Sequence, residues 1–239
     1  MGKNILIIGA SGDIGAAIAR SLAEQGYQLL LHYNQNRSAI AEYAAGLPEE
    51  TVLSVMQADL SSESGVRHLL SKIAFPVDAI IFAGGRAYFS LFQDTSEGVM
   101  NEMLNLHVKA PWLITKELLP SMLQKKQGKI IFITSIWGET GASNEVVYSS
   151  VKGAQNSFVK ALAKEVAPSG VSVNAVSPGF IDTKMNHHLN PEEVIRITDE
   201  IPANRAGKAE EVANMVNFLI SDKASYIQGE VINVTGGWS

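Results

Sequence analysis

The first 33 residues carry a strand, a glycine-rich turn, a helix and a second strand in direct succession. An apolar run at 4–8 leads into Gly9, Gly12 and Gly15, a helical pattern follows at 14–25, and a second apolar run occupies 28–33. Glycines at such a turn let the backbone approach a pyrophosphate, and free N–H groups at the helix start attract the anion. A tight turn without a ligand needs the same glycines, so both interpretations stay open here. In either case the unit predicts a parallel sheet.

Strand and helix patterns alternate along the whole chain. We predict strands near 4–8, 28–33, 51–56, 77–83, 128–134, 171–176 and 230–234, and helices near 14–25, 37–45, 62–73, 97–122, 146–167 and 209–220. This alternation predicts an α/β fold, a single doubly wound Rossmann-type domain whose mostly parallel seven-stranded sheet has helices on both faces. The domain spans 1–239, with a dinucleotide-binding half of about 1–95 and a catalytic and substrate-binding half of about 96–239. A ligand is expected beyond the carboxyl ends of the strands.

Composition narrows the class of protein. With 239 residues, 46% of them hydrophobic, the chain can bury one large core. It has no cysteine, which excludes disulfides and cysteine-based metal sites, and a net charge of −5 gives no reason to expect nucleic acid. The longest apolar runs are strand-sized and no leader segment precedes the first strand, so we expect no membrane contact and a cytoplasmic location.

Tyr148 and Lys152 lie four residues apart in a helical pattern, and Ser135 follows the strand pattern that ends at 134. The spacing puts the phenol and the ammonium one turn apart on one helix face, where a cation favours phenolate. A free phenol, with a pKa of about 10, is a weak acid near neutrality, so Lys152 would supply the bias that acid catalysis needs. A packed ring beside a surface amine is the commoner meaning of such a pair. Together with a nucleotide signal, the trio predicts carbonyl reduction without a metal.

These motifs, taken in order, resemble the short-chain dehydrogenase/reductase family over essentially the whole chain. The landmarks are GASGDIG at 9–15, ADL at 58–60, AGG at 83–85, the Ser135/Tyr148/Lys152 set, VNAVSPGFIDT at 173–183 and a C-terminal NVTGGW. Within the family the sequence looks most like bacterial 3-oxoacyl-[acyl-carrier-protein] reductases, which act in fatty acid biosynthesis. The resemblance implies an oxidoreductase, and a homotetramer formed through the helices 97–122 and 146–167 and the last strand.

The cofactor is predicted from the end of the second strand. Sites for NAD place an acid there, whereas residues 32–37 contain none, so NADP(H) is favoured, with Asn34 and Arg37 near its 2′-phosphate. By resemblance, Asp59 and Leu60 hold the adenine. The remaining cofactor contacts implied by the family are Gly9, Ser11, Gly12, Asp13, Ile14, Gly15, Ala83, Gly84, Tyr148, Lys152, Pro178, Gly179, Ile181 and Thr183. Asp59 also fits a turn or cap before the helix at 62–73.

Three positions depart from the family pattern. Asp13 stands where the middle glycine is usual, which should weaken pyrophosphate binding unless the carboxylate points away. Phe82 replaces an asparagine that helps tie the sheet together, and we expect a structural role. His107 stands at the position of the fourth catalytic residue, also an asparagine. Because much of that residue's work is done by its main-chain carbonyl in the family, His107 is retained as a catalytic candidate, with an imidazole that can titrate.

The substrate is the least constrained feature. Trp137, Glu139 and Glu145, and the loop residues Lys184, Met185, His187 and His188, are expected to form the pocket wall and lid. Lys125, Lys126 and Lys129 fit a docking patch for acyl carrier protein.

Two alternatives to a 3-oxoacyl reductase stay open. The run from Ser135 to Tyr148 also resembles the 5-aminopentanone reductases that act on modified elongation factor P, and a carboxylate such as Glu145 suits an amine tail. The two glutamates also fit an exposed loop and a helix start. A protein of another class, a catalytically weak nucleotide-binding interaction protein, is conceivable because of Asp13, Phe82 and His107.

Overall fold

One parallel sheet of seven strands runs through the computed structural model, which describes residues 3–48, 50–187 and 189–238. Its strands are β1 Asn4–Ile8, β2 Gln28–Tyr33, β3 Val52–Gln57, β4 Ala79–Phe82, β5 Gly128–Ile133, β6 Val171–Pro178 and β7 Val231–Val234. Their spatial order is β3-β2-β1-β4-β5-β6-β7, with every neighbouring pair parallel. The predicted fold class is confirmed, and the sheet is entirely parallel.

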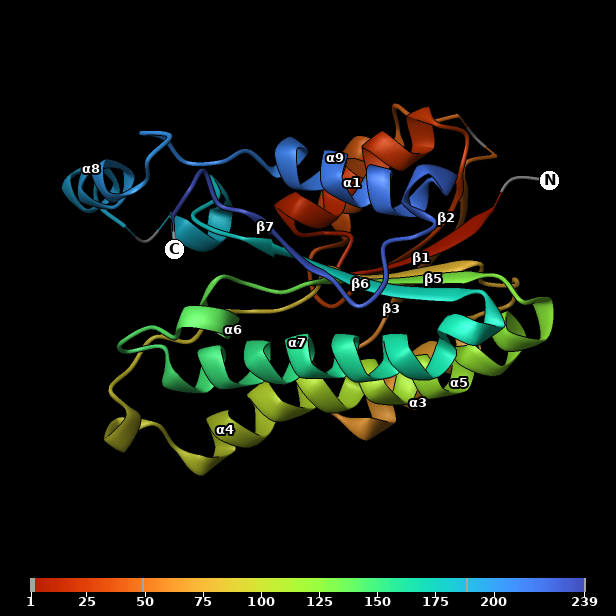
Figure 1. Ribbon diagram of the computed structural model, residues 1–239, viewed down its shortest axis with the longest axis horizontal. Helices are drawn as coiled ribbons and strands as arrows, with labels where there is room; N and C mark the ends of the chain where they lie inside the picture. The colour runs from red at the N-terminus through yellow and green to blue at the C-terminus, as the bar shows by residue number, and fades with distance from the viewer. Residues whose placement is uncertain (1–2, 49, 188, 239) are drawn as a thin grey trace.

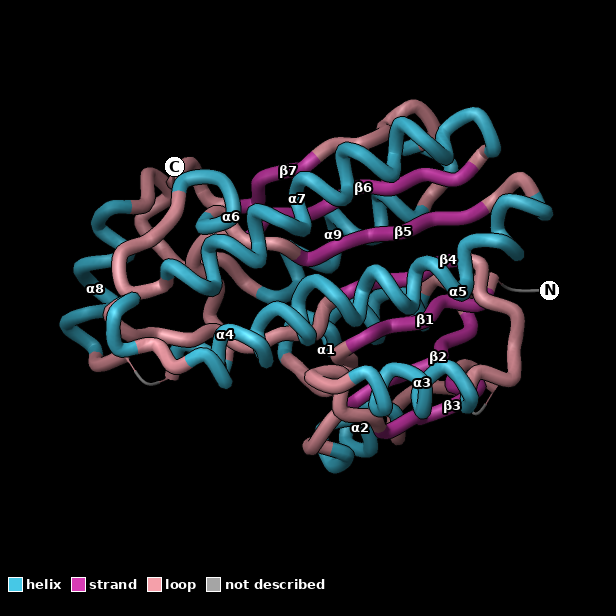
Figure 2. The backbone as a smooth tube through the Cα atoms, turned by 90° about the horizontal axis from the view of Figure 1, so that it is seen from below, coloured by secondary structure: helices cyan, strands magenta, loops and turns pink. Residues whose placement is uncertain are grey.

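Helices cover both faces of the sheet (Figure 1). The longer helices are α1 Asp13–Glu24, α2 Arg37–Ala44, α3 Glu63–Lys72, α4 Glu97–Leu104, α5 Ala110–Lys125, α7 Val146–Val166, α8 Pro191–Glu200 and α9 Ala209–Ile220. In Figure 1, α1 and α9 lie above the sheet while α3, α5 and α7 lie below it. Figure 2, seen from below, shows α5 and α7 running along the central strands.

The core consists of one apolar layer on each face. Successive residues of β1 alternate between the layers, because side chains of a strand point to opposite faces: Ile5 and Ile7 pack toward α1 and α9, while Leu6 and Ile8 pack toward α3, α5 and α7. Strands buried on both sides need continuous apolar runs, which is what β1 and β4 have. Phe82, the departure in β4, is 3% exposed and stacks on Phe132 of β5 with ring centroids 4.6 Å apart. Its role is therefore structural, as expected.

The predicted helix at 97–122 is interrupted in the structure. It consists of α4, a π-helical turn at Asn105–Lys109, and α5. Two further helices that we did not predict are the short α6, Trp137–Thr140, and α8. Asn190 and Glu193 form a capping box at the start of α8, a signal for a helix start that the sequence does contain. Both extra helices lie beyond the carboxyl ends of the strands.

The strand order reverses between β1 and β4, and the loops after these two strands touch. Gly9 has φ +84°, and a Cβ atom placed on it would lie 2.3 Å from the Gly84 Cα atom. Glycine is thus required at position 9 both by the backbone conformation and by this close approach. The crevice of an open α/β sheet forms at such a reversal.

None of the helices in the described ranges is long and apolar enough to cross a bilayer.

Candidate active site

The glycine-rich turn presents the start of α1 to the crevice. Helix α1 begins at Asp13 after Gly12, which makes no side-chain cap, so the first N–H groups of the helix are available to an anion. A Cβ atom on Gly15 would lie 2.2 Å from the Gly9 carbonyl oxygen, so glycine allows the helix to pack closely on the turn. Gly9, Ser11 and Gly12 line the crevice, whereas Gly15 lies buried beneath it.

Asp13 points away from this anion site. Its Oδ2 atom accepts a hydrogen bond of 2.6 Å from the backbone N–H of Lys184, which begins the short turn after Thr183. The carboxylate thereby connects the start of α1 to the loop after β6, and it lines a separate cleft beside Arg20 and Lys208. This is the orientation under which the departure from glycine is compatible with pyrophosphate binding.

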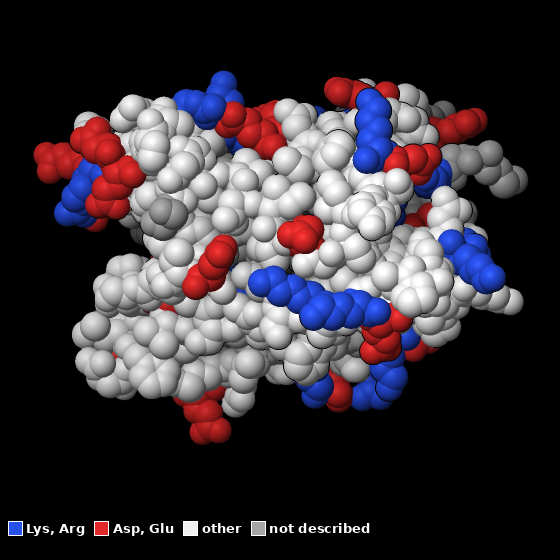
Figure 3. Space-filling model, in the orientation of Figure 1, with Lys and Arg blue, Asp and Glu red and all other residues white. Residues whose placement is uncertain are grey.

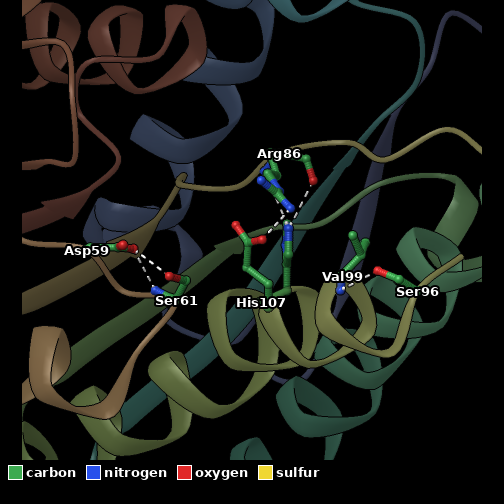
Figure 4. A network of polar contacts seen from close by, with 7 residues as sticks. Asp59, Ser61, Arg86, Ser96, Val99 and His107 are labelled. Atoms are coloured by element: carbon green, nitrogen blue, oxygen red, sulfur yellow. Dashed lines mark hydrogen bonds and ion pairs between the residues drawn. The ribbon is translucent and has the colours of Figure 1, made fainter.

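A cavity of about 430 Å³ runs from the glycine-rich turn toward the ends of β2 and β3. Most of the predicted adenosine contacts line it, namely Asn34, Asp59, Leu60, Ala83 and Gly84, together with His32, Gln35 and Asn36. The Asp59 carboxylate accepts hydrogen bonds from the backbone and hydroxyl of Ser61, 3.0 and 2.7 Å long, which is the turn role foreseen as its alternative (Figure 4). Arg37 is exposed in the first turn of α2 and is not part of the cavity wall.

His32 fixes the floor of this cavity. Its Nδ1 atom accepts from the Gly9 N–H at 3.2 Å, and its Nε2 atom lies 3.0 Å from the Ala58 carbonyl oxygen. The carbonyl can only accept, so Nε2 carries the proton and the ring is neutral. Burial lowers the pKa of His32 to about 4, in agreement with that state. In the sequence His32 counted only as a residue without negative charge. Its hydrogen bonds, which connect the ends of β1, β2 and β3, were not predicted.

Ser135, Tyr148 and Lys152 come together on the wall of a second cavity, of about 290 Å³. Ser135 follows β5, and the other two lie one turn apart on α7, as the spacing predicted. Their exposed fractions are 9%, 9% and 4%. The Lys152 Nζ atom lies 5.6 Å from the centroid of the Tyr148 ring and donates a 2.9 Å hydrogen bond to the Ile133 carbonyl oxygen.

Burial controls the titration of both groups on α7. It raises the pKa of Tyr148, an effect that hydrogen bonding with Ser135 partly opposes and the charge of Glu145 reinforces. It lowers the pKa of Lys152 to about 7. In the protein without ligands the pKa of the phenol is thus raised, with desolvation as the largest cause, and the lowering expected from Lys152 stays a prediction for the occupied site. Tyr148 is held as the protonated phenol, the form that can donate a proton.

The rest of this cavity comes from the loops after β6 and β4 and from the C-terminus. Ile14 lines it from the start of α1, and four predicted residues line it from the end of β6 and the loop that follows: Pro178, Gly179, Ile181 and Thr183. Three of the residues expected in the pocket wall and lid lie in the wall of this cavity: Trp137, Glu145 and Met185. Glu139 and His187 do not line it, and Lys184 lines the cleft beside Asp13 instead. His188 lies outside the described residues. Sequence reasoning missed Phe89 and Trp238, although the C-terminal tryptophan belongs to a recognised landmark.

His107 lies in the π-helical turn and also lines the second cavity. Its main-chain carbonyl oxygen, the atom expected to take part in a proton relay, accepts a 2.7 Å hydrogen bond from the Gln155 side chain. Its ring meets the Tyr148 ring edge to face, with centroids 5.8 Å apart. The imidazole is fully buried.

The two cavities share Ala83, Gly84 and Gly85 in their walls. A long ligand can therefore pass over this segment, with one end between β2 and β3 and the other beside Tyr148. Side chains on Gly9 or Gly15 would collide with neighbouring backbone, so the cradle exists because these residues are glycines. The residues present fit a dinucleotide.

Comparison with known proteins identifies the family. The profile of the Enoyl-(Acyl carrier protein) reductase family matches residues 9–239. The chain is 50% identical to YmfI of Bacillus subtilis strain 168, named an uncharacterized oxidoreductase, over all of this chain and 99% of that protein. It is 33% identical to the 3-oxoacyl-[acyl-carrier-protein] reductase FabG of Escherichia coli K12 over 99% of this chain and 97% of that one. The chain belongs to the short-chain dehydrogenase/reductase family.

Solved structures agree with this assignment. A Beutenbergia cavernae protein described as an NAD(P)-dependent gluconate 5-dehydrogenase, with NADP bound at low occupancy, has a TM-score of 0.92 at 30% identity, covering 99% of this chain and 96% of that one. YwfH, an NADPH-dependent reductase involved in bacilysin biosynthesis, has a TM-score of 0.92 at 27% identity, covering 100% and 99%. The reductase is thus an NAD(P)-dependent oxidoreductase acting on CH–OH and C=O groups, and these neighbours support the predicted NADP(H) cofactor.

Proposed function

We propose that this reductase uses NADPH to reduce a ketone to an alcohol, most simply as a 3-oxoacyl-[acyl-carrier-protein] reductase. The observation that carries the proposal is the position of Ser135, Tyr148 and Lys152 on a cavity that joins the dinucleotide cleft at Gly84. FabG proteins of several bacteria are 33 to 37% identical to the chain. The absence of acidic residues from 32–37 supports NADPH over NADH.

The proposed mechanism assigns a role to each of the three side chains. When bound, the reduced nicotinamide supplies the hydride. Ser135 binds the carbonyl oxygen, and the Tyr148 hydroxyl donates its proton to the oxygen as negative charge develops there. Lys152 binds the nicotinamide ribose and, when charged, stabilises the phenolate left on Tyr148. Burial favours this sequence because the phenol is protonated before substrate arrives.

The carrier-docking patch expected from Lys125, Lys126 and Lys129 stays a prediction, and the positions of two of these lysines do not favour it. Lys129 lies near the amino end of β5, so it is roughly 20 Å from Ser135 along the strand direction. Its Nζ atom donates hydrogen bonds to the carbonyl oxygens of Leu219 and Ser221, and Lys125 forms an ion pair of 2.9 Å with Asp78. Figure 3 shows charges of both signs interspersed on the face in view, with no extended basic field.

A second substrate class is favoured by the cavity wall. Glu145 contributes a carboxylate close enough to raise the pKa of Tyr148. The surrounding wall is aromatic and apolar, with Trp137 and Trp238 packed edge to face at 5.0 Å between centroids. A ketone with an apolar stem and a terminal ammonium fits such a wall, which supports the 5-aminopentanone group of modified elongation factor P as the alternative substrate.

One competition experiment separates these substrates. Turnover of a β-ketoacyl thioester and of aminopentanone-modified elongation factor P is measured with NADPH and with NADH, on the wild type and on Glu145→Gln. A carrier-type reductase prefers the thioester, and Glu145→Gln leaves its KM unchanged. An aminoketone reductase prefers the modified protein, and Glu145→Gln raises its KM. NADPH binding without turnover of either substrate, or of a wider ketone panel, would instead favour the nucleotide-binding interaction protein.

We also propose a homotetramer formed through α4, α5 and α7. Large apolar side chains are exposed on and beside these helices: Phe89, Leu91, Phe92, Leu104, Trp112 and Val146. The lower left of Figure 3, over α4 and the start of α7, shows few charged residues. Exposed apolar surface of this kind marks contact sites. Light scattering measures the mass directly, and a monomer at micromolar concentration would refute the proposal.

The cytoplasmic location stays a prediction.

A further inference from the structure

The imidazole of His107 connects the floor of the cofactor cleft to the proposed proton donor. The ring rises from the π-helical turn and reaches the backbone of Arg86, on the loop after β4 (Figure 4). Its Nε2 atom lies 3.1 Å from the Arg86 carbonyl oxygen and 3.4 Å from the Arg86 backbone nitrogen. On its other side the ring meets Tyr148 edge to face. One buried side chain therefore touches both halves of the site.

The ring can bond the Arg86 backbone through Nε2 in either neutral tautomer. With the proton on Nε2 the ring donates to the carbonyl oxygen at 3.1 Å, and with the proton on Nδ1 it accepts from the backbone N–H at 3.4 Å. Nδ1 is buried without a hydrogen-bond partner in the described structure. Burial and the charge of Lys152 lower the pKa of His107 to about 3, so the ring stays neutral through the physiological range. A buried polar atom without a partner costs stability, so stability alone does not account for an imidazole here.

Gly85 is fitted to this ring. A Cβ atom on Gly85 would lie 2.5 Å from the Cε1 atom of His107, closer than real Cβ contacts allow. Any larger residue at 85 would displace either the imidazole or the loop. The loop residues that surround the contact, Ala83 to Gly85, are the ones that form the shared wall of the two cavities.

A second contact holds the same loop from outside. The Arg86 guanidinium pairs with Glu102 of α4 at 2.7 Å, and both side chains are well exposed, 44% and 38%. An exposed pair of this kind contributes little, because water and salt screen it. The buried bond to the His107 ring is therefore the contact expected to set the position of the loop.

We propose that His107 is a positioning residue whose Nε2 atom, bonded to the Arg86 backbone, fixes the Gly84–Arg86 segment against the helix, so that the cofactor-binding floor and Tyr148 keep a constant separation. The proposal rests on the proposed reaction at this site. It differs from a main-chain relay role because it acts through the imidazole and not through the carbonyl oxygen of His107. It also predicts that an asparagine, the residue usual at this position in the family, is a poor substitute here.

The side-chain geometry supplies matched variants. In His107→Gln the side-chain amide reaches the position of Nε2 and can still bond the Arg86 backbone, whereas in His107→Asn the shorter amide replaces Nδ1 and does not reach. Lys109→Gln is the control, since it changes the same π-helical turn but breaks only the exposed pair to Glu63. Each variant is characterised by circular dichroism, by NADPH affinity from fluorescence titration, and by kcat and KM with the best ketone substrate.

We expect His107→Gln and Lys109→Gln to stay within about threefold of wild type in all constants, and His107→Asn to lose about tenfold or more in both NADPH affinity and kcat with an unchanged ketone KM. Gly85→Ala should show the same loss. Wild-type behaviour of a folded His107→Asn, or a loss in His107→Gln as large as in His107→Asn, would overturn the proposal. Because NADPH affinity needs no ketone, the test remains decisive even if the proposed substrates fail.

Discussion

Gly9 and Gly26 offer a matched pair for measuring what the close contact between the β1 and β4 loops contributes. Both have positive φ, +84° and +81°, so alanine is strained at both. A Cβ atom on Gly26 would meet nothing within 4 Å, whereas one on Gly9 would lie 2.3 Å from Gly84 Cα and 2.5 Å from Gly84 N. The pair separates conformational strain from collision with backbone.

The expected free energies follow from these contacts. Strain at positive φ costs about 1–3 kcal/mol, and alanine recovers about 0.4–1 kcal/mol by restricting the unfolded chain, so Gly26→Ala should lower the free energy of unfolding by roughly 1 kcal/mol. Gly9→Ala adds overpacking of about 1–3 kcal/mol. The collision involves backbone on both sides and cannot be relieved by a rotamer change, so we expect about 3 kcal/mol or more in total.

Urea unfolding, followed by circular dichroism without cofactor, measures both changes, and fluorescence titration measures NADPH affinity. Gly9→Ala should also weaken NADPH binding by about tenfold or more, since the loops that form the cleft must separate, while Gly26→Ala should not. Equal destabilisation of the two variants, within about 0.5 kcal/mol, would show that the Gly9–Gly84 contact yields freely and would refute the reasoning.

Three further predictions concern single side chains. Tyr148→Phe should lower kcat by about 10²–10⁴-fold with NADPH affinity unchanged, and retention of more than about a tenth of the wild-type kcat would remove Tyr148 as the proton donor. His32 and His107 have folded pKa values of about 4 and about 3, below the 6.5 of an unfolded histidine, so the unfolded chain binds more protons than the folded one as the pH falls. Their contribution to the free energy of unfolding is therefore complete above pH 6.5 and declines below it, by up to roughly 1.4 kcal/mol per pH unit for each ring. Urea unfolding across this pH range should show a shallower decline in His32→Gln than in the wild type. Asp13→Ala removes the hydrogen bond to the Lys184 N–H and should raise the ketone KM by about tenfold, with Asp13→Asn in between; an unchanged KM for Asp13→Ala would show that the contact does not order the loop.

The sheet and the juxtaposition of Ser135, Tyr148 and Lys152 were predictable because each depends on local pattern. Continuous apolar runs fixed the strands, alternation with helices fixed parallel pairing, and the interval between Tyr148 and Lys152 placed both on one helix face. Ser135 could be assigned because it follows a strand whose carboxyl end lies beside that helix.

Features that depend on tertiary contacts were not predictable in this way. Arg37 follows the same strand as Asn34, but the chain turns into α2 there and carries it out of the cavity. Nothing in the local sequence of Lys125, Lys126 and Lys129 shows which end of the sheet they occupy, so their distance from the site required the structure. The orientation of Asp13 depends on Lys184, 171 residues away. The sequence shows a glycine at 85, but only the structure shows that the His107 ring leaves no room for a larger residue there.

The bond between Asp13 and the Lys184 N–H has a consequence for protein engineering. Residues 178–181, 183, 185, 186 and 189 line the substrate cavity, and their segment would be the natural one to exchange between relatives in order to transfer specificity. Its first turn is anchored on a side chain at the other end of the sequence, so a chimaera that takes this segment into a scaffold with glycine at 13 leaves the anchor behind. Successful transplants should carry both pieces together.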